Sequence, residues 1–289
     1  MNKIRHNYSV AVLMTCHNRV ETTLACLRRL VPQLGNGDKV FLVDDGSEDN
    51  TGAKVKTEFP EVDVINGDGT LYWAKGMRLA WETAIKSGCK FDFFLWLNDD
   101  VMLKPDAISV LISDFDQLIA NRTFTPVRSD SSTIPVVVGT CAMDESFAAS
   151  SYAATNRKDE RIEPNGVSPQ KAEGWFNGNV VLIPFAAYAI VGMISDDYSH
   201  SRADYDYAER LKRKKIPFYA SSNFVGVCRR DSCRVLTEKG LAKRIRYLFM
   251  PGNTNLHDLW LYRSRHFGHV RAFVSCCHLI VHVLFSGKK

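Results

Sequence analysis

Asp99 and Asp100 lie side by side at the end of an apolar run, residues 91–97. A run of this length predicts a buried strand, so the two carboxylates would lie at its carboxyl end, where open α/β sheets bind ligands. Adjacent like charges favour a cation or strong hydrogen-bond donors nearby. Mg²⁺ or Mn²⁺ carrying a phosphate fits this need, because both metals prefer carboxylate, water and phosphate oxygens. Taken alone, the pair could equally cap a helix that begins near Lys104.

Two earlier apolar runs end in a similar way. Residues 9–15 predict a first strand, and residues 40–43 predict a second strand that ends in Asp44 and Asp45. A carboxylate at the second strand end can accept the N3–H of a pyrimidine base. The polar residues at the first strand end could bind the same ligand or only cap the next helix; they are Thr15, His17, Asn18 and Arg19.

A third predicted strand, residues 62–65, leads into a glycine-rich loop with two aromatic residues, residues 66–73. The helix expected at residues 74–87 could face a diphosphate with its N-terminus and with Lys75 or Arg78; alternatively, the aromatic residues of the loop only pack. No GxGxxG follows the first strand, which argues against a dinucleotide-binding dehydrogenase. The alternation of strands and helices predicts a parallel sheet.

In this order, the segments resemble a family 2 glycosyltransferase of the GT-A type over about residues 8–230. Thr15–Arg19, Val43–Ser47 and Asn98–Asp100 match the family's three donor-site signatures in sequence and spacing. The stretch Gly67–Trp73 resembles a subgroup that includes rhamnosyl- and other hexosyltransferases of bacterial surface polysaccharides. The resemblance implies an α/β, GT-A nucleotide-sugar-binding fold with a mostly parallel central sheet and a helical C-terminal extension.

The resemblance also implies roles for single residues. Asp45 would bond the pyrimidine of a UDP- or dTDP-linked donor, with the polar residues of the first strand end beside the base. Asp99 would lie by the ribose or a metal-bound water, and Asp100 would bind Mn²⁺ or Mg²⁺. Asn98 occupies the position where many members have the first acid of a DxD motif, and no late histidine follows, so the resemblance identifies no third metal ligand.

The acceptor side is expected in the second half of the chain. Asp204, near the start of a predicted helix, has the position of the family's catalytic base, although a single aspartate there can also be a cap. The polar residues 155–173 are predicted as a mobile loop over the site. Residues expected to contact the sugar or the acceptor are Trp73, Trp175, Asn177 and Asp206, the last of which could instead pair with Arg210.

These roles predict an inverting, metal-dependent transfer of a hexose, such as rhamnose, glucose or galactose, to a glycan or lipid-linked acceptor. The metal would neutralise the diphosphate, and the base would take the acceptor proton on the opposite face of the sugar. A nucleotidyl- or phosphoryl-transferring enzyme on a similar sheet, or a non-catalytic sugar-nucleotide-binding module, remains the alternative.

Charge is unevenly distributed along the 289 residues. From Arg210 to Lys289 there are 17 Lys and Arg against three acids, whereas the first 209 residues hold 20 basic and 29 acidic residues. Basic and apolar residues together predict helices that lie on an anionic membrane surface, although these helices could also pack back onto the core. The apolar stretch at residues 270–285 is too short to span a bilayer. No nucleic-acid-binding motif accompanies the basic residues.

We expect a GT-A domain at residues 1–235, with a donor-nucleotide half (1–120) and an acceptor half (121–235), followed by a helical extension at residues 236–289. No signal peptide opens the chain, and the eight cysteines show no CxxC pair or zinc spacing. These features predict reduced thiols in a cytoplasmic protein, peripheral at the inner face of the cell membrane.

Overall fold

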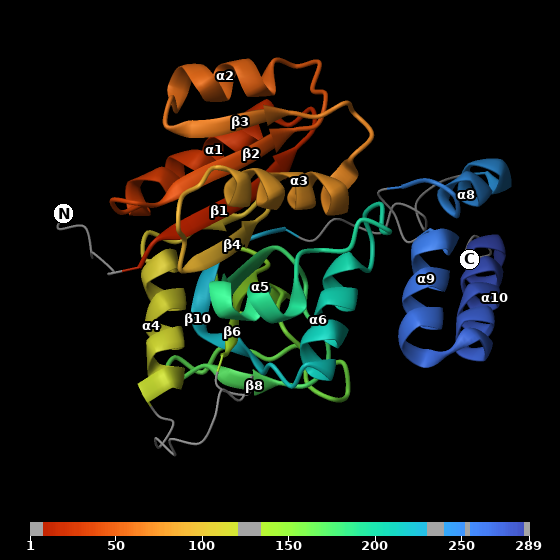
Figure 1. Ribbon diagram of the computed structural model, residues 1–289. Helices are drawn as coiled ribbons and strands as arrows, with labels where there is room; N and C mark the ends of the chain where they lie inside the picture. Colours follow the sequence, from red (N-terminus) through yellow and green to blue (C-terminus); the bar gives the residue numbers. More distant parts are fainter. Residues whose placement is uncertain (1–7, 121–133, 230–239, 252–254, 286–289) are drawn as a thin grey trace.

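A mixed β-sheet runs through the part of the chain that the computed structural model describes, residues 8–120, 134–229, 240–251 and 255–285 (Figure 1). Its strands are β1 Val10–Cys16, β2 Lys39–Asp44, β3 Val62–Asn66, β4 Phe93–Leu97, β5 Met102–Leu103, β6 Val136–Ala142, β7 Ser150–Tyr152, β8 Gln170–Ala172, β9 Val180–Pro184 and β10 Phe218–Val227. They follow the order β3-β2-β1-β4-β9-β6-β10-β5, with β7 beside β6 and β8 beside β10.

The first four strands of this order are parallel, as the alternation of strands and helices predicts. The register pairs Thr15 with Val43 and Cys16 with Asp44, so the ends of β1 and β2 are level. β4 is parallel to β1 on its other side. β4 consists of five consecutive buried apolar residues, which is typical of a strand covered on both faces. The carboxyl ends of β1, β2 and β4 therefore lie along one edge of the sheet.

The second half of the sheet is less regular than a mostly parallel sheet. β9 lies between β4 and β6 and is antiparallel to both, and β5 is antiparallel to β10, whereas β6 and β10 are parallel. All five residues of β9 are buried, and a continuous apolar run carries no information about strand direction. The predicted α/β class is confirmed, with a sheet that is parallel across β3, β2, β1 and β4 and mixed across its remaining strands.

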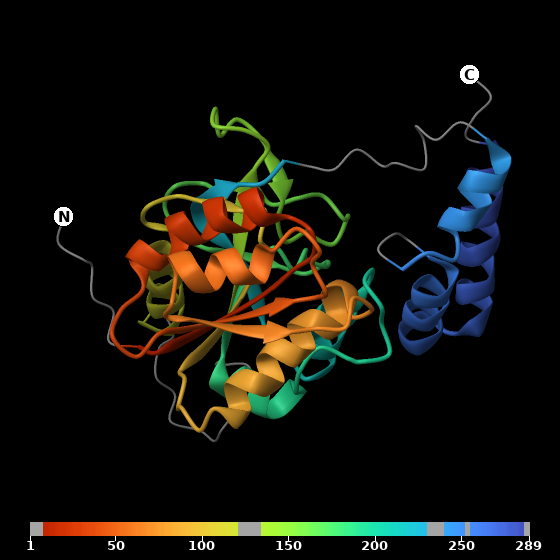
Figure 2. The same cartoon turned by 90° about the horizontal axis from the view of Figure 1, so that it is seen from above.

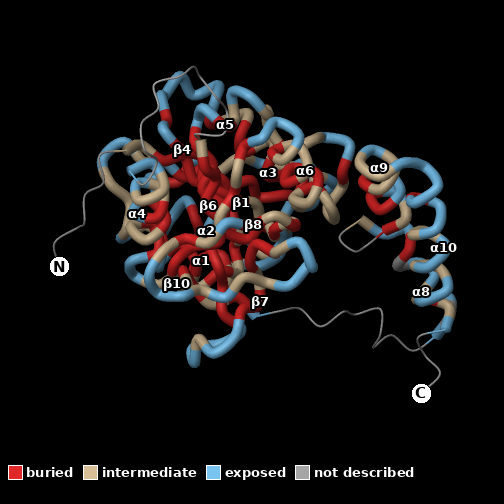
Figure 3. The backbone as a smooth tube through the Cα atoms, turned by 90° about the horizontal axis from the view of Figure 1, so that it is seen from below, coloured by how far each residue is buried: buried red, intermediate tan, exposed pale blue. Residues whose placement is uncertain are grey.

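Helices cover both faces of the sheet (Figure 2). α3, α5 and α6 pack their apolar side chains into one core, and α1, α2 and α4 pack into the other. Figure 3 shows the buried backbone concentrated in the strands between these two helical layers. The bounds are α1 Val20–Leu30, α2 Thr51–Glu58, α3 Tyr72–Lys86, α4 Ala107–Ala120, α5 Phe185–Val191 and α6 Ala203–Arg213, with a short 3-10 helix at Val31–Gln33.

The segment at residues 155–173, predicted as a mobile loop, is held at both ends. β8 pairs with β10, and Thr155 forms a bridge with Arg161. The backbone N–H groups of Glu173 and Gly174 donate to the Thr155 carbonyl. Short pairings of this kind have no periodicity that the sequence would reveal, and they replace the expected free loop.

Three helices follow the sheet: α8 Leu241–Tyr247, α9 Leu256–Phe267 and α10 His269–Phe285. α9 packs against α6, and α10 packs against α9 (Figures 1 and 2). The buried carboxylate of Asp258 in α9 accepts hydrogen bonds from the backbone N–H groups of residues 199–201. None of the described helices has both the length and the hydropathy of a membrane span.

Candidate active site

Asp99 and Asp100 follow β4 and share one guanidinium group. Arg19, directly before α1, donates from Nη1 to Asp99 Oδ1 and from Nη2 to Asp100 Oδ2, both at 3.1 Å. Thr23, one helical turn after Arg19, donates to the other oxygen of Asp99 at 3.1 Å. The expectation that the acidic pair needs nearby cations or donors is thus met by α1. Thr23 lies on the helix face of Arg19, at i+4, and this spacing could have identified it.

The two carboxyl groups differ in burial. Asp99 is 3% exposed, and its burial raises its pKa to about 7, while Arg19 lowers the pKa and Asp100 raises it. The side chain of Asp100 is 25% exposed and is the more accessible of the two. The thiol of Cys228, which follows β10, lies 3.5 Å from Asp100 Oδ1. Burial and the nearby Asp100 raise the pKa of this thiol, which keeps it protonated.

Asp45, at the end of β2, holds the glycine-rich loop. Its Oδ1 accepts the backbone N–H of Gly69 at 2.8 Å, and its Oδ2 accepts that of Tyr72 at 2.9 Å. A Cβ on Gly67 would lie 2.7 Å from Asp45 Oδ1, so the loop approaches this closely only because residue 67 has no side chain. Asp45 therefore fixes the loop that begins α3, and its contact with a donor base remains a prediction.

The polar residues after β1 are bonded to the end of β2. His17 Nδ1 donates to the Asp45 carbonyl at 2.6 Å, and Asn18 Oδ1 accepts the backbone N–H of Glu48 at 2.7 Å. Thr15 is half-buried and packs against Gly76 of α3, where a Cβ would collide with its hydroxyl. The exposed His17, Asn18 and Arg19 thus form one surface with Asp100 at the edge of the sheet, whereas Asp45 is only 3% exposed.

Trp73, in the first turn of α3, contacts both the end of β4 and the segment before β9. Its indole N–H donates to Asn98 Oδ1 at 2.7 Å, directly before the acidic pair. Lys75 is exposed; hydrogen bonds from Thr70 lower the pKa of Asp68 in the loop, and the positive charge of Lys75 lowers it further. Arg78 is engaged elsewhere, because its guanidinium donates to Glu82 and to the Ile194 carbonyl. Of the two predicted phosphate contacts on this helix, Lys75 is the accessible one.

Asp204 lies in the first turn of α6, beside Trp73. Its Oδ2 accepts the backbone N–H of Gly178 at 3.1 Å, and its Oδ1 accepts that of Tyr205 at 2.9 Å. Burial raises the pKa of Asp204 to about 6, although both backbone hydrogen bonds lower it. A Cβ on Gly178 would lie 2.5 Å from the Trp73 ring and 3.5 Å from the Asp204 Cβ. These three residues therefore meet at one point.

A short backbone bridge connects Asp204 to the acidic pair. Gly178 donates to Asp204, and the next residue, Asn179, accepts the backbone N–H of Asn98 at 2.9 Å. Asn98 in turn precedes Asp99. Segments that are about 100 residues apart in the sequence are thus brought to one site.

Aromatic side chains surround Asp204. Trp175 stacks on Tyr205 with ring centroids 4.3 Å apart, and the Arg202 guanidinium lies 4.8 Å from the Tyr205 ring. Asn177 is half-buried in the same segment as Trp175. Tyr205 and Arg202 were not among the predicted site residues, although they lie one residue after and two residues before Asp204 in the sequence.

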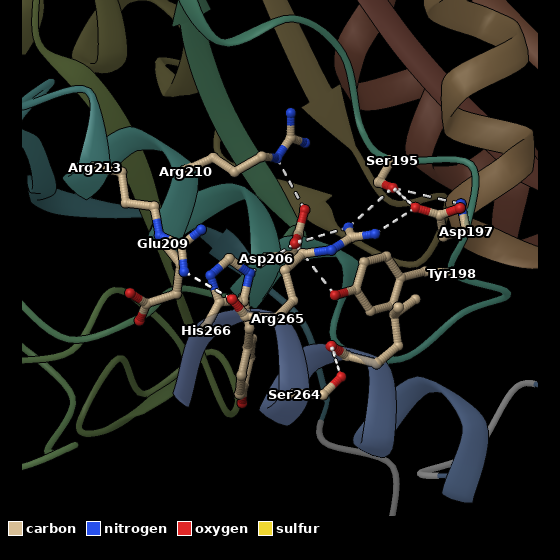
Figure 4. A network of polar contacts seen from close by, with 12 residues as sticks. Ser195, Asp197, Tyr198, Asp206, Glu209, Arg210, Arg213, Ser264, Arg265 and His266 are labelled. Atoms are coloured by element: carbon tan, nitrogen blue, oxygen red, sulfur yellow. Dashed lines mark hydrogen bonds and ion pairs between the residues drawn. The ribbon is translucent and has the colours of Figure 1, made fainter. Parts of the chain in front are cut away.

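Asp206, predicted to contact the sugar or the acceptor, is fully buried. Arg210 donates to Asp206 Oδ2 at 2.9 Å, and His266 and Arg265 of α9 approach Oδ1 at 2.8 and 3.3 Å (Figure 4). Tyr198 also donates to Asp206 Oδ1. An acceptor cannot reach this carboxylate, so the pairing with Arg210, which the i,i+4 spacing also allowed, describes Asp206 better.

The donor set suits a divalent metal that is bound together with a substrate. Among the described residues, no group of three or more His, Cys, Asp or Glu could hold a metal by itself. Mg²⁺, however, commonly binds through one or two carboxylates and takes its remaining ligands from water and substrate phosphates. Asp100 and Asp99 can supply such carboxylates, and Mn²⁺ accepts the same oxygen ligands.

Comparisons with known proteins agree with this geometry. Residues 11–143 match the family described as glycosyl transferase family 2. The mannosyltransferase PcManGT from Pyrobaculum calidifontis, solved in complex with GDP-Man and Mn²⁺, superposes with a TM-score of 0.53 at 14% identity, covering 97% of this chain and 71% of that chain. S. aureus TarS 1–349 superposes with a TM-score of 0.53 at 10% identity, covering 96% of this chain and 81% of that chain.

A longer TarS structure gives a TM-score of 0.52 at 12% identity and covers 90% of this chain and 43% of that one. A comparison with curated protein sequences found no match. At these identities the structural similarity shows the fold alone. The family match covers the segment that contains Asp45, Asp99 and Asp100. The comparisons therefore show a chain that has the GT-A fold and whose residues 11–143 match the glycosyl transferase family 2 model.

Proposed function

We propose that this protein is an inverting, metal-dependent hexosyltransferase that uses a nucleotide-diphosphate sugar. The observation that carries the proposal is the short bridge Asp204–Gly178–Asn179–Asn98, which places a half-buried carboxylate beside the end of β4. A site with metal-binding carboxylates on one side and a separate carboxylate on the other suits glycosyl transfer. That reaction needs a cation at the diphosphate of the donor and a base at the hydroxyl of the acceptor.

Asp204 would act as the general base. With its pKa raised to about 6, the group is ionised at neutral pH yet basic enough to take a proton from an acceptor hydroxyl. A bound Mg²⁺ or Mn²⁺ would neutralise the diphosphate leaving group as a Lewis acid. Asp100 and Asp99 would hold that metal, and Arg19 and Lys75 would add positive charge beside it. Attack from the side opposite the diphosphate would invert the anomeric carbon.

The donor would carry a pyrimidine base at Asp45, as UDP or dTDP. PcManGT was solved with GDP-Man and Mn²⁺, which supports a nucleotide-diphosphate sugar and a divalent metal but not a pyrimidine. A thermal-shift panel of UDP, dTDP and GDP sugars with and without Mn²⁺ tests both points. We expect a pyrimidine donor to stabilise the protein only in the presence of metal; a metal-independent or guanine-specific response would refute this donor assignment.

Product analysis tests the reaction itself. Glycosyl transfer releases a free nucleoside diphosphate and leaves the sugar on the acceptor with inverted configuration. Release of nucleoside monophosphate or of pyrophosphate would instead indicate phosphoryl or nucleotidyl transfer. Asp204→Asn should abolish transfer and keep metal-dependent donor binding, and full activity in this variant would refute the assignment of the base.

The acceptor would be a glycan or a lipid-linked glycan of surface polysaccharide synthesis, reached at the inner face of the membrane. The support is the exposed apolar face of α10, where Val270, Phe273 and Phe285 are 79%, 63% and 58% exposed. Apolar residues next to Lys and Arg favour an anionic membrane surface. The protein should sediment with anionic vesicles, and Phe273→Ser with Phe285→Ser should weaken this binding; no binding by the unchanged chain would refute membrane contact.

A further inference from the structure

A pocket of about 330 Å³ lies between the start of α6 and the helices α9 and α10. Its polar lining consists of Arg202, Arg263, Ser275, His278 and His282, and none of the described lining residues is acidic. Its volume is at the lower end of the range of small-ligand sites. It is separate from the contacts around Asp99 and Asp100, because its lining comes mainly from the C-terminal helices.

The two arginines of this pocket have unused hydrogen-bonding capacity. The Nε atoms of Arg202 and Arg263 are buried, and neither has a hydrogen-bond partner among the described residues. Both guanidinium groups lie over aromatic rings, Arg202 at 4.8 Å from the Tyr205 ring and Arg263 at 5.3 Å from that of Phe267. Stacking fixes the plane of a guanidinium, whose terminal N–H groups can then donate to a planar or tetrahedral anion.

The described parts of α9 and α10 place little negative charge beside this pocket, and an acid outside its lining, Asp204, interacts electrostatically with Arg202. α10 contains no Asp or Glu, and the only acid in α9, Asp258, is fully buried and bonded to the segment at residues 199–201. The described lining itself contains no carboxylate, and arginine is the side chain best suited to phosphate oxygens. The pocket therefore has the chemistry of a phosphate site.

The pocket also borders an apolar surface. Leu259 and Leu279 form part of its wall. On α10, His278 is four residues after Val274, which is 61% exposed, so these two side chains are neighbours on the helix surface. Val281 and Phe285, 51% and 58% exposed, continue the same apolar face. A ligand with a phosphate in the pocket could thus lay a hydrocarbon chain along α10.

We infer that this pocket binds the phosphate or diphosphate group of a lipid-linked acceptor. The inference rests on the proposed function, because Arg202 precedes Asp204 by two residues and their Cα atoms are at most about 7 Å apart. An acceptor held by its phosphate between Arg202 and Arg263 would present its sugar hydroxyl near the proposed base. Its lipid would follow the exposed face of α10 toward the membrane.

The test measures binding of octyl phosphate, below its micelle concentration, to the full chain by calorimetry, with inorganic phosphate as the head-group control. Arg202→Gln and Arg263→Gln each remove one pocket guanidinium. Arg246→Gln, on the exposed side of α8, removes the same charge outside the pocket. We expect octyl phosphate to bind more tightly than inorganic phosphate, and each pocket variant to lose at least about tenfold in affinity, with Arg246→Gln unchanged.

The inference would be overturned if octyl phosphate did not bind, or if Arg246→Gln lost as much affinity for octyl phosphate as the pocket variants do. It would also be overturned if inorganic phosphate bound as tightly as octyl phosphate, which would indicate a site for soluble phosphate. Metal-dependent binding of UDP is measured on the same variants. If Arg263→Gln weakened UDP binding instead, the pocket would belong to the donor and the inference would fail. If the unchanged chain bound octyl phosphate through the two arginines but no nucleotide, the proposed function would fail while the phosphate site remained.

Discussion

Asp204 and Asp206 are two residues apart on α6, and their surroundings give the two carboxyl groups opposite acidities. Burial raises the pKa of Asp204, whose hydrogen-bond donors among the described residues are backbone N–H groups. The pKa of Asp206 is lowered despite its burial, because His266, Arg210 and Arg265 surround it. Environments that separate the pKa values of neighbouring acids commonly separate their roles. Here one carboxylate is available as a base, and the other anchors the helix.

The acidity of Asp204 predicts the pH dependence of transfer. A general base must be ionised, so kcat should rise as the pH increases through about 6, the raised pKa of Asp204. Asp204→Asn should remove this dependence together with the activity. The measurement is kcat against pH at saturating donor and metal, with Asp197→Asn, a change of an exposed carboxylate, as control. A rate in the unchanged enzyme that stays flat through pH 6 would contradict the role of Asp204.

The same raised pKa predicts that the proposed base destabilises the fold. Between the ordinary pKa of 3.8 and about 6, the folded state keeps a proton on Asp204 that the unfolded state has lost, so the contribution to stability falls as the pH rises across this window. Asp204→Asn should therefore unfold at a higher temperature than the unchanged protein at neutral pH, and the difference should vanish below about pH 4. Equal melting temperatures of Asp204→Asn and the unchanged protein at neutral pH would show that burial of the ionised Asp204 does not destabilise the fold.

At the scale of elements, three close contacts join α3, the end of β4, the segment before β9 and the start of α6. Trp73 of α3 bonds Asn98 after β4, and Gly178, before β9, lies against the Trp73 ring and donates to Asp204. A side chain at residue 178 would separate these elements. The position of Asp204 relative to the acidic pair thus depends on a tryptophan packed on a glycine.

This packing predicts a coupling that a double-mutant cycle can measure. Gly178→Ala places a Cβ 2.5 Å from the Trp73 ring, and overpacking of this kind costs about 1–3 kcal/mol of unfolding free energy. Trp73→Phe removes the ring atoms that Cβ would meet and costs about 1 kcal/mol for the lost hydrogen bond to Asn98. The double variant should be more stable than the sum of the single effects predicts. Additive effects in denaturant unfolding would show that the two residues do not touch.

The strands and their acidic ends were predictable because they depend on local pattern alone. Apolar runs ending in Asp44, Asp45, Asp99 and Asp100 indicated β2 and β4, and parallel strands necessarily bring those ends to one edge. The direction of β9 was not predictable, because a run of buried apolar residues contains no signal that distinguishes a parallel from an antiparallel strand. The burial of Asp206 was not predictable either, because His266 and Arg265, 60 residues away, decide it.

At the scale of the whole molecule, the C-terminal helices are tied to the helix of the proposed base. Asp258 of α9 accepts bonds from residues 199–201 just before α6, and Arg265 and His266 reach Asp206 within α6 (Figure 4). Sequence composition suggested a basic extension from residue 236 that either contacts a membrane or packs on the core. The two uses are compatible, because α9 packs on the core while α10 exposes an apolar face.

This connection predicts that Asp206→Ala loosens α9. His266 and Arg265, whose side chains are 1% and 31% exposed, would lose their shared carboxylate, and leaving buried charge partners uncompensated costs about 3–5 kcal/mol. Asp197→Ala removes a 52% exposed partner of the same Arg265 and should cost at most about 1 kcal/mol. Denaturant unfolding measures both costs, and hydrogen exchange of residues 256–267 should quicken far more in Asp206→Ala than in Asp197→Ala. Unchanged exchange in Asp206→Ala would mean that α9 is held by its apolar contacts alone, and that the C-terminal helices can move without the helix that carries Asp204.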